Sequence, residues 1–481
     1  MKEYKLDRLI VIATALSVER DIDMLLEFIL LEAMDITSCD GGTVYTLEDG
    51  YLSFRNMITK SKNVYLNSGR GEIKLPPIPL GRTHVCACSA LDKKKINIPD
   101  VYLSEEYDFA GAQKYDALND YRTKSMLVLP MEDDQGDVIG VLQLINAMDD
   151  DGEICPFPED CERLISALSS LAAVSLNNSQ LSQEVYDILH SFVRVMVGAI
   201  DTRSSYNANH TKSMVRYGER FLQWLDETNS PYKFPERAKD PFIMSIWLHD
   251  IGKLVIPLSV MDKATRLGRR KEKIMHRIEV AILMDRVRQL EDPAHSDEAG
   301  ENIRRIKEAR DLILKADEAG FLEDETVEGL KEAAGLKCFT SEGEEVPLLN
   351  EDELEAITIR KGTLTAVERR TMEEHVVQTA KMLEKMKFRG IYAGVPKWAA
   401  AHHELLDGSG YPEGKRGEEI STETRIITIL DIYDALTAED RPYKPPMSPE
   451  KSFVILHGMA DEGKLDKELL TLFEESRAWV R

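Results

Sequence analysis

Eight of the ten histidines in this 481-residue chain lie after residue 200. A lone histidine on a helix is usually an ordinary core or surface residue, so its neighbours decide whether it could do chemistry. Neutral imidazole is also the commonest metal ligand in proteins, so histidines beside carboxylates or other histidines are candidate ligands. Five have such settings: His210, His249, His375, His402 and His403.

One of these settings is a histidine and aspartate pair in the segment SIWLHDIGKLVIP. The pair lies at the end of an apolar helical run, and Gly252 is expected to terminate that helix. A buried aspartate is costly without a cation or hydrogen-bond partners, so adjacent His249 and Asp250 can converge on one metal ion. The Asp250 carboxylate could bridge to a second ion, and Lys253 could bind a phosphate oxygen. Taken alone, the pair could equally be an ordinary dipeptide.

Two further segments point to the same chemistry. His402 and His403 end an alanine-rich helical stretch and lead into a glycine-rich loop, AAAHHELLDGSGYPEG. Two adjacent buried imidazoles are hard to explain as core packing. The third segment, RIITILDIYDALTAEDRPYK, places Asp431 and Asp434 on one helical face, with Arg441 and Lys444 after them. This order predicts a metal ligand near a phosphate-binding pair of cations.

Composition limits what such a site could bind. The chain has a formal net charge of −24, with 43% hydrophobic and 30% charged residues. Binding to long nucleic acids depends on many lysine and arginine contacts with phosphate, so this charge argues against a DNA partner. A small phosphorylated ligand remains open if metal ions or local cations bind it. The length predicts two or three domains.

The chain is expected to be cytoplasmic. No apolar run approaches the ~18 to 20 residues of a membrane span, and the N-terminal residues become acidic too early for a signal peptide. Six cysteines are scattered without a repeated CxxC spacing, which suggests reduced thiols. Cys86 and Cys88 could form a redox or metal pair, although no second pair accompanies them.

The N-terminal part predicts an antiparallel sheet packed on helices. Residues 21 to 35 have helical periodicity and lead into two strand-like runs around Glu48-Asp49-Gly50. Residues 123 to 147 form two more such runs. From Pro158 to about Asp201 the spacing of apolar residues predicts one long helix, which either packs within its own subunit or forms a parallel dimer stalk.

The three motif segments HDIGK, HHELLDGSGYP and DIYDALTAEDRPYK, in this order, resemble the defining motifs of HD-GYP phosphodiesterases. The resemblance covers about Tyr186 to Ser452. It implies an all-α domain that hydrolyses 3′,5′-cyclic di-GMP to the linear dinucleotide, and onward to GMP in some cases. The upstream segment AIDTRSSYNANHTKS is similar to the part of the family that supplies a further ligand histidine, here His210.

The resemblance also implies roles for single residues. One metal ion would be bound by His210, His249, Asp250 and Asp431, and the other by His375, His402, His403 and the bridging Asp250. Asp201 could reach a third ion, although the family often has glutamate there. Asp250 and Lys253 would be catalytic, and the substrate would contact Lys253, Tyr411, Arg441 and Lys444. Iron or manganese suits such imidazole and carboxylate ligands, although zinc, cobalt and nickel also bind them.

One departure from the family is large. Pro257 and His375 are 118 positions apart, far more than in the family, and the family pattern resumes at RKGTLTAVERRTMEEH. We therefore expect an insertion over residues 269 to 359, and this assigns the ligand role to His375 rather than His276. Its helical periodicity and acidic excess predict a solvated helical subdomain, either a passive addition or a lid over the site.

The N-terminal residues resemble a GAF domain, above all in YRTKSMLVLPM and GDVIGVLQLIN, which look like the GAF domains of cyclic-nucleotide phosphodiesterases. The resemblance implies an α+β sensor fold and a small-molecule ligand. Ligand-binding relatives often carry an Asn-Lys pair followed by Phe and an acidic pair. Here Ala147 follows Asn146, and Phe157 and Asp160 come later.

The predicted order is a GAF-like sensor over residues 1 to 158, a connecting signalling helix over 159 to 200, and a split HD-GYP domain over 201 to 268 and 360 to 481 around the insertion. We expect a homodimer whose sensor controls the phosphodiesterase. Two alternatives stay open: hydrolysis of another nucleotide such as cyclic GMP-AMP, and a cyclic-dinucleotide receptor or adaptor that has lost catalysis. An intact set of ligands favours the enzyme.

Overall fold

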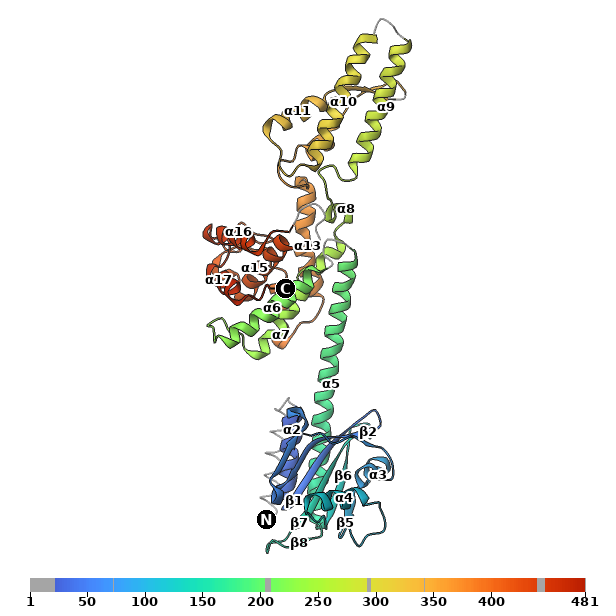
Figure 1. Cartoon of the computed structure of the whole chain (residues 1–481), viewed down its shortest axis with the longest axis vertical. Coiled ribbons are helices and arrows are strands. Elements are labelled where there is room, and N and C mark those ends of the chain that lie inside the picture. Colours follow the sequence, from blue (N-terminus) through green and yellow to red (C-terminus); the bar gives the residue numbers. More distant parts are fainter. Residues whose placement is uncertain are drawn as a thin grey trace. The chain divides into compact units, whose positions relative to one another are not determined.

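The computed structural model describes residues 22–71, 73–203, 209–291, 296–340, 342–438 and 446–480. The chain divides into two compact units, Met1–Leu189 and His190–Arg481 (Figure 1). Within the described ranges, no helix has the length and apolar character needed to cross a membrane.

The N-terminal unit is built on an antiparallel sheet with strand order β3-β2-β1-β7-β6-β5. These strands are β1 (Cys39–Glu48), β2 (Tyr51–Thr59), β3 (Val64–Asn67), β5 (Ile96–Ile98), β6 (Met126–Glu132) and β7 (Val138–Met148). The short β4 (Ile78–Pro79) pairs with β2, and β8 (Ile154–Cys155) pairs with β7. Asp49 and Gly50 join β1 to β2, and both have the positive φ that a two-residue hairpin turn requires.

Helices cover both faces of this sheet. Successive side chains of a strand point to opposite faces, and in β6 Leu127 and Leu129 join one hydrophobic cluster while Val128 joins the other. The first cluster includes residues of α2 (Ile22–Ile36) and of the start of α5 (Glu159–Arg203). The second includes α3 (Val85–Asp92), and Ala112 of α4 (Ala110–Asn119) packs against it.

The C-terminal unit is helical around one main core. Its elements are α6 (His210–Glu227), α7 (Glu236–Leu248), the 3-10 helix η3 (Ile251–Val255), α8 (Leu258–Met261), α13 (Ala366–Glu384), η5 (Gly390–Gly394), α14 (Val395–Ala399), α15 (Thr422–Thr437), α16 (Pro449–Asp461) and α17 (Lys467–Ser476). Buried Tyr433, Phe453 and Phe473 form an aromatic contact at the centre of this core. A capping box of Thr365 and Glu368 begins α13.

A second hydrophobic cluster belongs to the segment between α8 and α13. The segment contains α9 (Arg270–Glu291), α10 (Ser296–Glu318), α11 (Asp324–Ala334) and α12 (Glu351–Ile357). A short hairpin of β9 (Lys337–Phe339) and β10 (Glu345–Pro347) was not expected from the sequence, because three-residue strands leave almost no periodic pattern.

The two ends of this segment meet. The Thr363 hydroxyl donates to the Lys263 carbonyl at 3.1 Å. The fully buried Arg266 guanidinium donates to carbonyls at the C-terminal end of α10 and to Ile359 O at 2.6 Å. The predicted fold class, an α+β sheet unit followed by a helical unit with a helical insertion, is confirmed.

Candidate functional site

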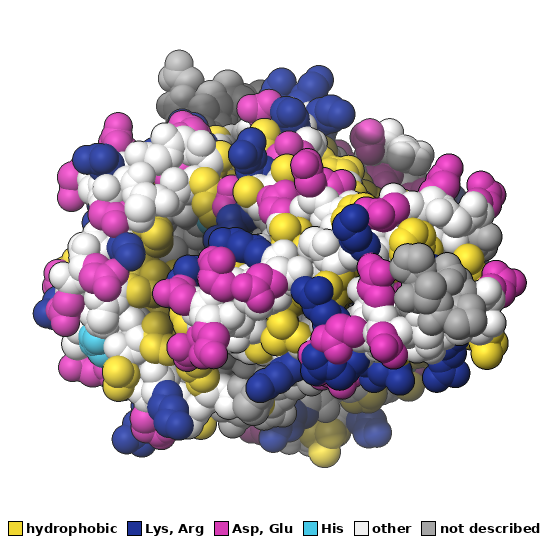
Figure 2. All heavy atoms as spheres, turned by 90° about the horizontal axis from the view of Figure 1, so that it is seen from above, with side chains coloured by type: hydrophobic (Ala, Val, Ile, Leu, Met, Phe, Trp, Pro, Cys, Tyr) yellow, Lys and Arg dark blue, Asp and Glu magenta, His cyan; other side chains and the backbone are white. Residues whose placement is uncertain are grey.

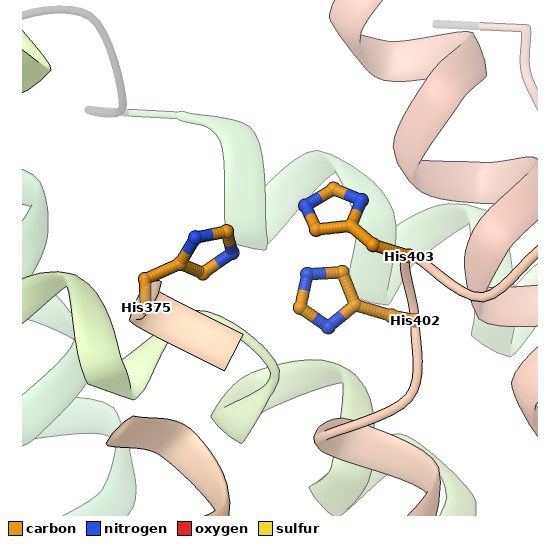
Figure 3. A group of neighbouring side chains, drawn as sticks. All are labelled: His375, His402 and His403. Carbon is orange, nitrogen blue, oxygen red and sulfur yellow. The ribbon is translucent and has the colours of Figure 1, made fainter. Parts of the chain in front are cut away.

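The histidines singled out in the sequence come together in the C-terminal unit from well-separated segments. His249 directly follows α7, and His375 lies in the middle of α13. His402 and His403 lie in the loop after α14, and Figure 3 shows their rings and that of His375 turned toward a common space. His210 is the first residue of α6.

Two clusters of ligand-type atoms result. In cluster one, His210 Nε2 lies 3.3 Å from His249 Nε2 and 3.3 Å from Asp431 Oδ1. In cluster two, the imidazole nitrogens of His375, His402 and His403 lie within 4.8 Å of one another. Such spacings allow each cluster to surround one ion.

Asp250 lies between the two clusters. Its Oδ2 atom is 3.2 Å from His249 Nε2 and 3.6 Å from His210 Nε2, so this oxygen faces cluster one. Its Oδ1 atom is 3.4 Å from His375 Nε2 and 3.9 Å from His402 Nε2, so the other oxygen faces cluster two. One carboxylate thus presents an oxygen to each cluster.

Backbone carbonyls set the orientation of three of these rings. The Nδ1 atoms of His249, His375 and His402 each lie 2.6 to 2.7 Å from the carbonyl three residues earlier in the chain. A carbonyl can only accept, so each Nδ1 carries the proton and Nε2 keeps its lone pair. This is the tautomer that a metal ligand needs.

The inner atoms of this site have no hydrogen-bond partner among the residues that the structure describes. His375 Nε2, His402 Nε2 and Asp250 Oδ1 are all buried, and none of them makes a hydrogen bond to this part of the chain. Buried polar atoms are nearly always satisfied, so three such atoms facing one space require a further group. Imidazole nitrogens and carboxylate oxygens suit a divalent cation of the iron, manganese or zinc type, and the residues fit such ions.

The protonation states agree with this assignment. Burial lowers the pKa of His375 to about 4 and holds the pKa of His402 well below its usual range. Burial would raise the pKa of Asp250, but Lys253 and the neighbouring His249 ring outweigh it and hold that pKa well below its usual range. Near neutral pH His375 and His402 are therefore neutral and Asp250 is ionised, as metal binding requires. His210 differs, because burial would lower its pKa but hydrogen bonds to Asp431 and Asp434 outweigh this effect and raise that pKa to about 10.

Two carboxylates with supporting contacts were not assigned a role in the sequence. Asp434 Oδ2 lies 2.7 Å from His210 Nδ1 and so orients that ring. Its position three residues after Asp431 on α15 was the available signal. Glu404, which is buried, accepts from the backbone N–H of Glu413 at 2.7 Å and Lys415 at 2.9 Å, and so braces the loop that carries Tyr411.

The structure describes two of the four residues that were expected to contact substrate. Lys253 Nζ donates to Asp250 Oδ2 at 2.6 Å, and the ring of Tyr411 lies 4.8 Å from the ring of His403. Arg441 and Lys444 lie outside the described residues. Asp201 lies in α5, and its side chain is also outside the description.

His276 is exposed on α9 and takes no part in the three candidate ligand groups of the described residues. The structure therefore groups His375, and not His276, with His402 and His403. These groups consist of histidine and aspartate alone. Cys86 and Cys88 are buried free thiols of α3, and burial raises the pKa of Cys86 to about 12.

The N-terminal unit contains a cavity of about 460 Å³ between the sheet, α3 and α4. Its wall is mostly apolar and aromatic, and Thr43, His84, Asp108 and Gln143 are among its polar residues. Asn146 does not line it. With a φ of 58°, this buried asparagine instead accepts from the Lys124 N–H and donates to the Tyr121 hydroxyl, which is a structural role.

Surface charge is mixed on the face that Figure 2 shows, where acidic and basic side chains are interspersed with small hydrophobic areas. The negative net charge is therefore not gathered into one continuous patch on this face.

Family comparisons match one segment in each of the two units. Residues 21–176 match a family model described as a GAF domain, and residues 352–469 match one described as an HD domain. The HD match begins near the end of the inserted segment and covers the second half of the candidate site.

Three curated relatives illustrate the similarity. A 3′3′-cGAMP-specific phosphodiesterase 3 of Vibrio cholerae is 44% identical over 21% of this chain and 21% of its own length. A cyclic di-GMP phosphodiesterase of Thermotoga maritima is 33% identical over 23% of this chain and 28% of its own length. A dual 3′,5′-cyclic-AMP and -GMP phosphodiesterase 11 of Drosophila melanogaster is 39% identical over 18% of this chain and 6% of its own length. The chain therefore covers at most 28% of the length of any of these three relatives.

Proposed function

We propose that this chain, which joins a GAF domain to an HD domain of the HD-GYP type, is a metal-dependent phosphodiesterase whose preferred substrate is 3′,5′-cyclic di-GMP. The product is the linear dinucleotide, with GMP as a further product. The GAF domain regulates this activity. The protein acts in the cytoplasm.

The observation that supports this proposal most directly is the position of Asp250. Its two oxygens face two different clusters of histidine and aspartate, which is how a carboxylate bridges two ions. Phosphodiesters resist hydrolysis because the ester and the nucleophile are both anionic. Two divalent ions held by one shared carboxylate would activate water and neutralise the phosphoryl oxygens.

The roles of the residues follow from their positions. His210, His249 and Asp431 would hold one ion, His375, His402 and His403 the other, and Asp250 both. We propose two ions of iron or manganese as the native metals, and Asp201 is the candidate ligand if a third ion binds. Lys253 sits beside Asp250 at the edge of the site, where its ammonium could donate to a phosphate oxygen. Tyr411 covers His403 and would contact a base, while Arg441 and Lys444 would bind phosphate.

Two alternatives make different predictions. The names of the relatives include both cyclic di-GMP and 3′3′-cGAMP, so cyclic GMP-AMP is the main competing substrate. A receptor or adaptor without catalysis is the other alternative, and the complete set of described ligand residues argues against it.

The cavity is the proposed sensor site of the GAF domain. A volume of about 460 Å³ suits a small organic molecule. Among the described residues, its lining contains no lysine or arginine but does contain Asp108. An anionic ligand would therefore find no side-chain cation, and we propose an uncharged molecule with an aromatic or other apolar body.

A homodimer along α5 is the proposed route of regulation. The helix buries one stripe in its own units, including Ala173, Leu176, Val193 and Val197. It exposes another with coiled-coil spacing: Val174, Asn178, Leu181, Val185, Ile188, Phe192 and Val195. Alternate steps of four and three residues, with a polar Asn at one a position, are typical of parallel two-stranded coiled coils.

The test is anaerobic purification of the full chain, metal analysis, and a product assay with cyclic di-GMP and cyclic GMP-AMP in competition. We expect about two metal ions per chain and faster turnover of cyclic di-GMP. Faster turnover of cyclic GMP-AMP would favour the first alternative, and bound cyclic dinucleotide without any product would favour the receptor. Mass measurement in solution tests the dimer: Ile188→Lys should produce monomers, whereas Gln183→Lys, an exposed position off the stripe, should not.

A further inference from the structure

Two buried threonines of the C-terminal unit each lie about one helical turn from a candidate ligand on the same helix. Thr379 lies on α13 one helical turn after His375, and Thr428 lies on α15 three residues before Asp431. Thr379 is 0% and Thr428 is 2% exposed, so water cannot replace the hydrogen bonds that their hydroxyl groups make.

Thr379 joins the helix of His375 to the turn that carries His249 and Asp250. Its hydroxyl donates to the His249 carbonyl at 3.0 Å and accepts from the Gly252 N–H at 3.0 Å. One side chain thus satisfies a backbone acceptor and a backbone donor on either side of Asp250.

The lack of a side chain at Gly252 allows this approach. A Cβ atom there would lie 1.9 Å from His375 O and 2.6 Å from Thr379 N, far inside contact distance. The turn and α13 are therefore packed backbone against backbone at the level of the candidate ligands.

Thr428 makes the equivalent connection on the other side of the site. Its hydroxyl lies 2.8 Å from the His402 carbonyl and 3.0 Å from Thr424 O of its own helix. The bond to His402 ties the loop of the paired histidines to the helix that carries Asp431.

Each bond therefore links the two clusters. Thr379 connects His249 of cluster one to the helix of His375 of cluster two, and Thr428 connects His402 of cluster two to the helix of Asp431 of cluster one. We propose that Thr379 and Thr428 are positioning residues that fix the distance between the two metal ions of the proposed phosphodiesterase. This inference rests on the proposed two-metal site, but not on its substrate.

The spacing matters for the chemistry. Two-metal hydrolysis requires ions ~3.5 to 4 Å apart, and residues around the direct ligands typically change metal affinity 10- to 100-fold when they are replaced. A threonine that only stabilised the fold would change thermal stability without changing the coupling between the ions.

The experiment compares the full chain with Thr379→Val, Thr379→Ser, Thr428→Val and Thr428→Ser, each reconstituted with Mn²⁺ alone. Valine keeps the shape of threonine but removes the hydroxyl, and serine keeps the hydroxyl. Ser452→Ala is the matched control, because this buried hydroxyl donates only to Ser448 O of its own helix among the described hydrogen bonds. Three quantities are measured: Mn²⁺ dissociation constants, the spin-coupled signal of the manganese pair, and thermal unfolding of the metal-free protein.

We expect both valine variants to bind Mn²⁺ about 10- to 100-fold more weakly and to show an altered spin-coupled signal, with serine restoring both. Ser452→Ala should lower thermal stability alone. Valine variants with the wild-type signal and affinity would overturn the inference, as would valine and serine variants that are equally impaired. If valine does not fold, Thr379→Ala and Thr428→Ala are scored against serine in the same way.

The wild-type protein separates this inference from the proposed function. If it binds a coupled Mn²⁺ pair but hydrolyses no cyclic dinucleotide, the proposed function fails while the threonine comparison stands. If it binds no Mn²⁺ pair, both fail.

Discussion

The candidate metal centre and the cavity of the GAF domain are built on opposite principles. In the candidate metal centre, His375 Nε2, His402 Nε2 and Asp250 Oδ1 have no hydrogen-bond partner in the described part of the chain. Among the described residues, no such unpartnered atom belongs to a side chain that lines the cavity. The first site is defined by atoms that need a ligand, and the second by a volume enclosed by apolar walls.

The difference determines how each site should respond to mutation. Removing one ligand atom from the centre leaves charges and lone pairs that no neighbour can compensate. Changing one wall residue of the cavity alters the shape and contact area of the site, so the affinity for a small ligand should change only by degrees. We therefore expect all-or-none effects in the C-terminal unit and graded effects in the N-terminal one.

The largest effect is expected for Asp250→Ala. Because one carboxylate faces both clusters, its loss should remove most of the bound metal and lower kcat/KM by about 10³-fold or more, equivalent to ~4 kcal/mol. Metal analysis and a product assay measure this, with circular dichroism as the check on folding. Full metal content together with normal turnover would contradict the bridging role.

The next effect distinguishes two histidines. His375→Ala should reduce bound metal to about half, since one of the two clusters loses a ligand, whereas His276→Ala should leave it at the wild-type level. His276 is the natural control because it is exposed on α9. Metal analysis of both variants tests this assignment. The reverse result would mean that the insertion does not span residues 269 to 359 and that His276, not His375, is the ligand.

A smaller effect is expected for Lys253→Ala and Arg441→Ala. A lost charge-assisted hydrogen bond to phosphate costs ~1.5 to 3 kcal/mol, so activity should fall about 10- to 100-fold while both ions remain bound. Steady-state kinetics with metal analysis test this. Unchanged rates at both low and saturating substrate would remove the residue concerned from the site.

The smallest effect is expected in the cavity. Ala112→Leu adds volume to the α4 side of the wall and should weaken binding of any activating ligand while changing basal turnover by less than about threefold. Ala110→Leu, on the exposed side of the same helix, is the control. Ligand titration of turnover provides the measurement. A large loss of basal activity in Ala112→Leu alone would contradict the expectation that substitutions in the cavity have only graded effects.

Sequence patterns identified the candidate site residues whose role depends on their immediate neighbours. His249-Asp250 directly follows an apolar helix, His402-His403 lies in the loop after an alanine-rich helix, and Asp431 lies within an apolar helix, so each stood out locally. Strand alternation and the turn at Asp49-Gly50 likewise predicted the sheet.

What the sequence did not reveal depends on distant contacts. Asp434 orients His210 from 224 positions away, and Thr379 reaches His249 across 130. Hydroxyl groups of threonine are common on helices, and nothing in the local pattern marks one that bonds to another segment. The cavity is equally invisible, because its volume depends on how α3 and α4 lie on the sheet.

The hydrogen bond from Thr363 to Lys263 bears on how the segment between α8 and α13 could change in evolution. It joins two points that are 100 residues apart, with Arg266 adding a bond to Ile359. A segment that leaves and re-enters a fold at one place, and carries its own hydrophobic cluster, can be gained or lost in a single genetic event without altering the core it interrupts. The inserted helices are therefore the part of the C-terminal unit that we expect to differ most in length, sequence and presence among proteins that share its histidines.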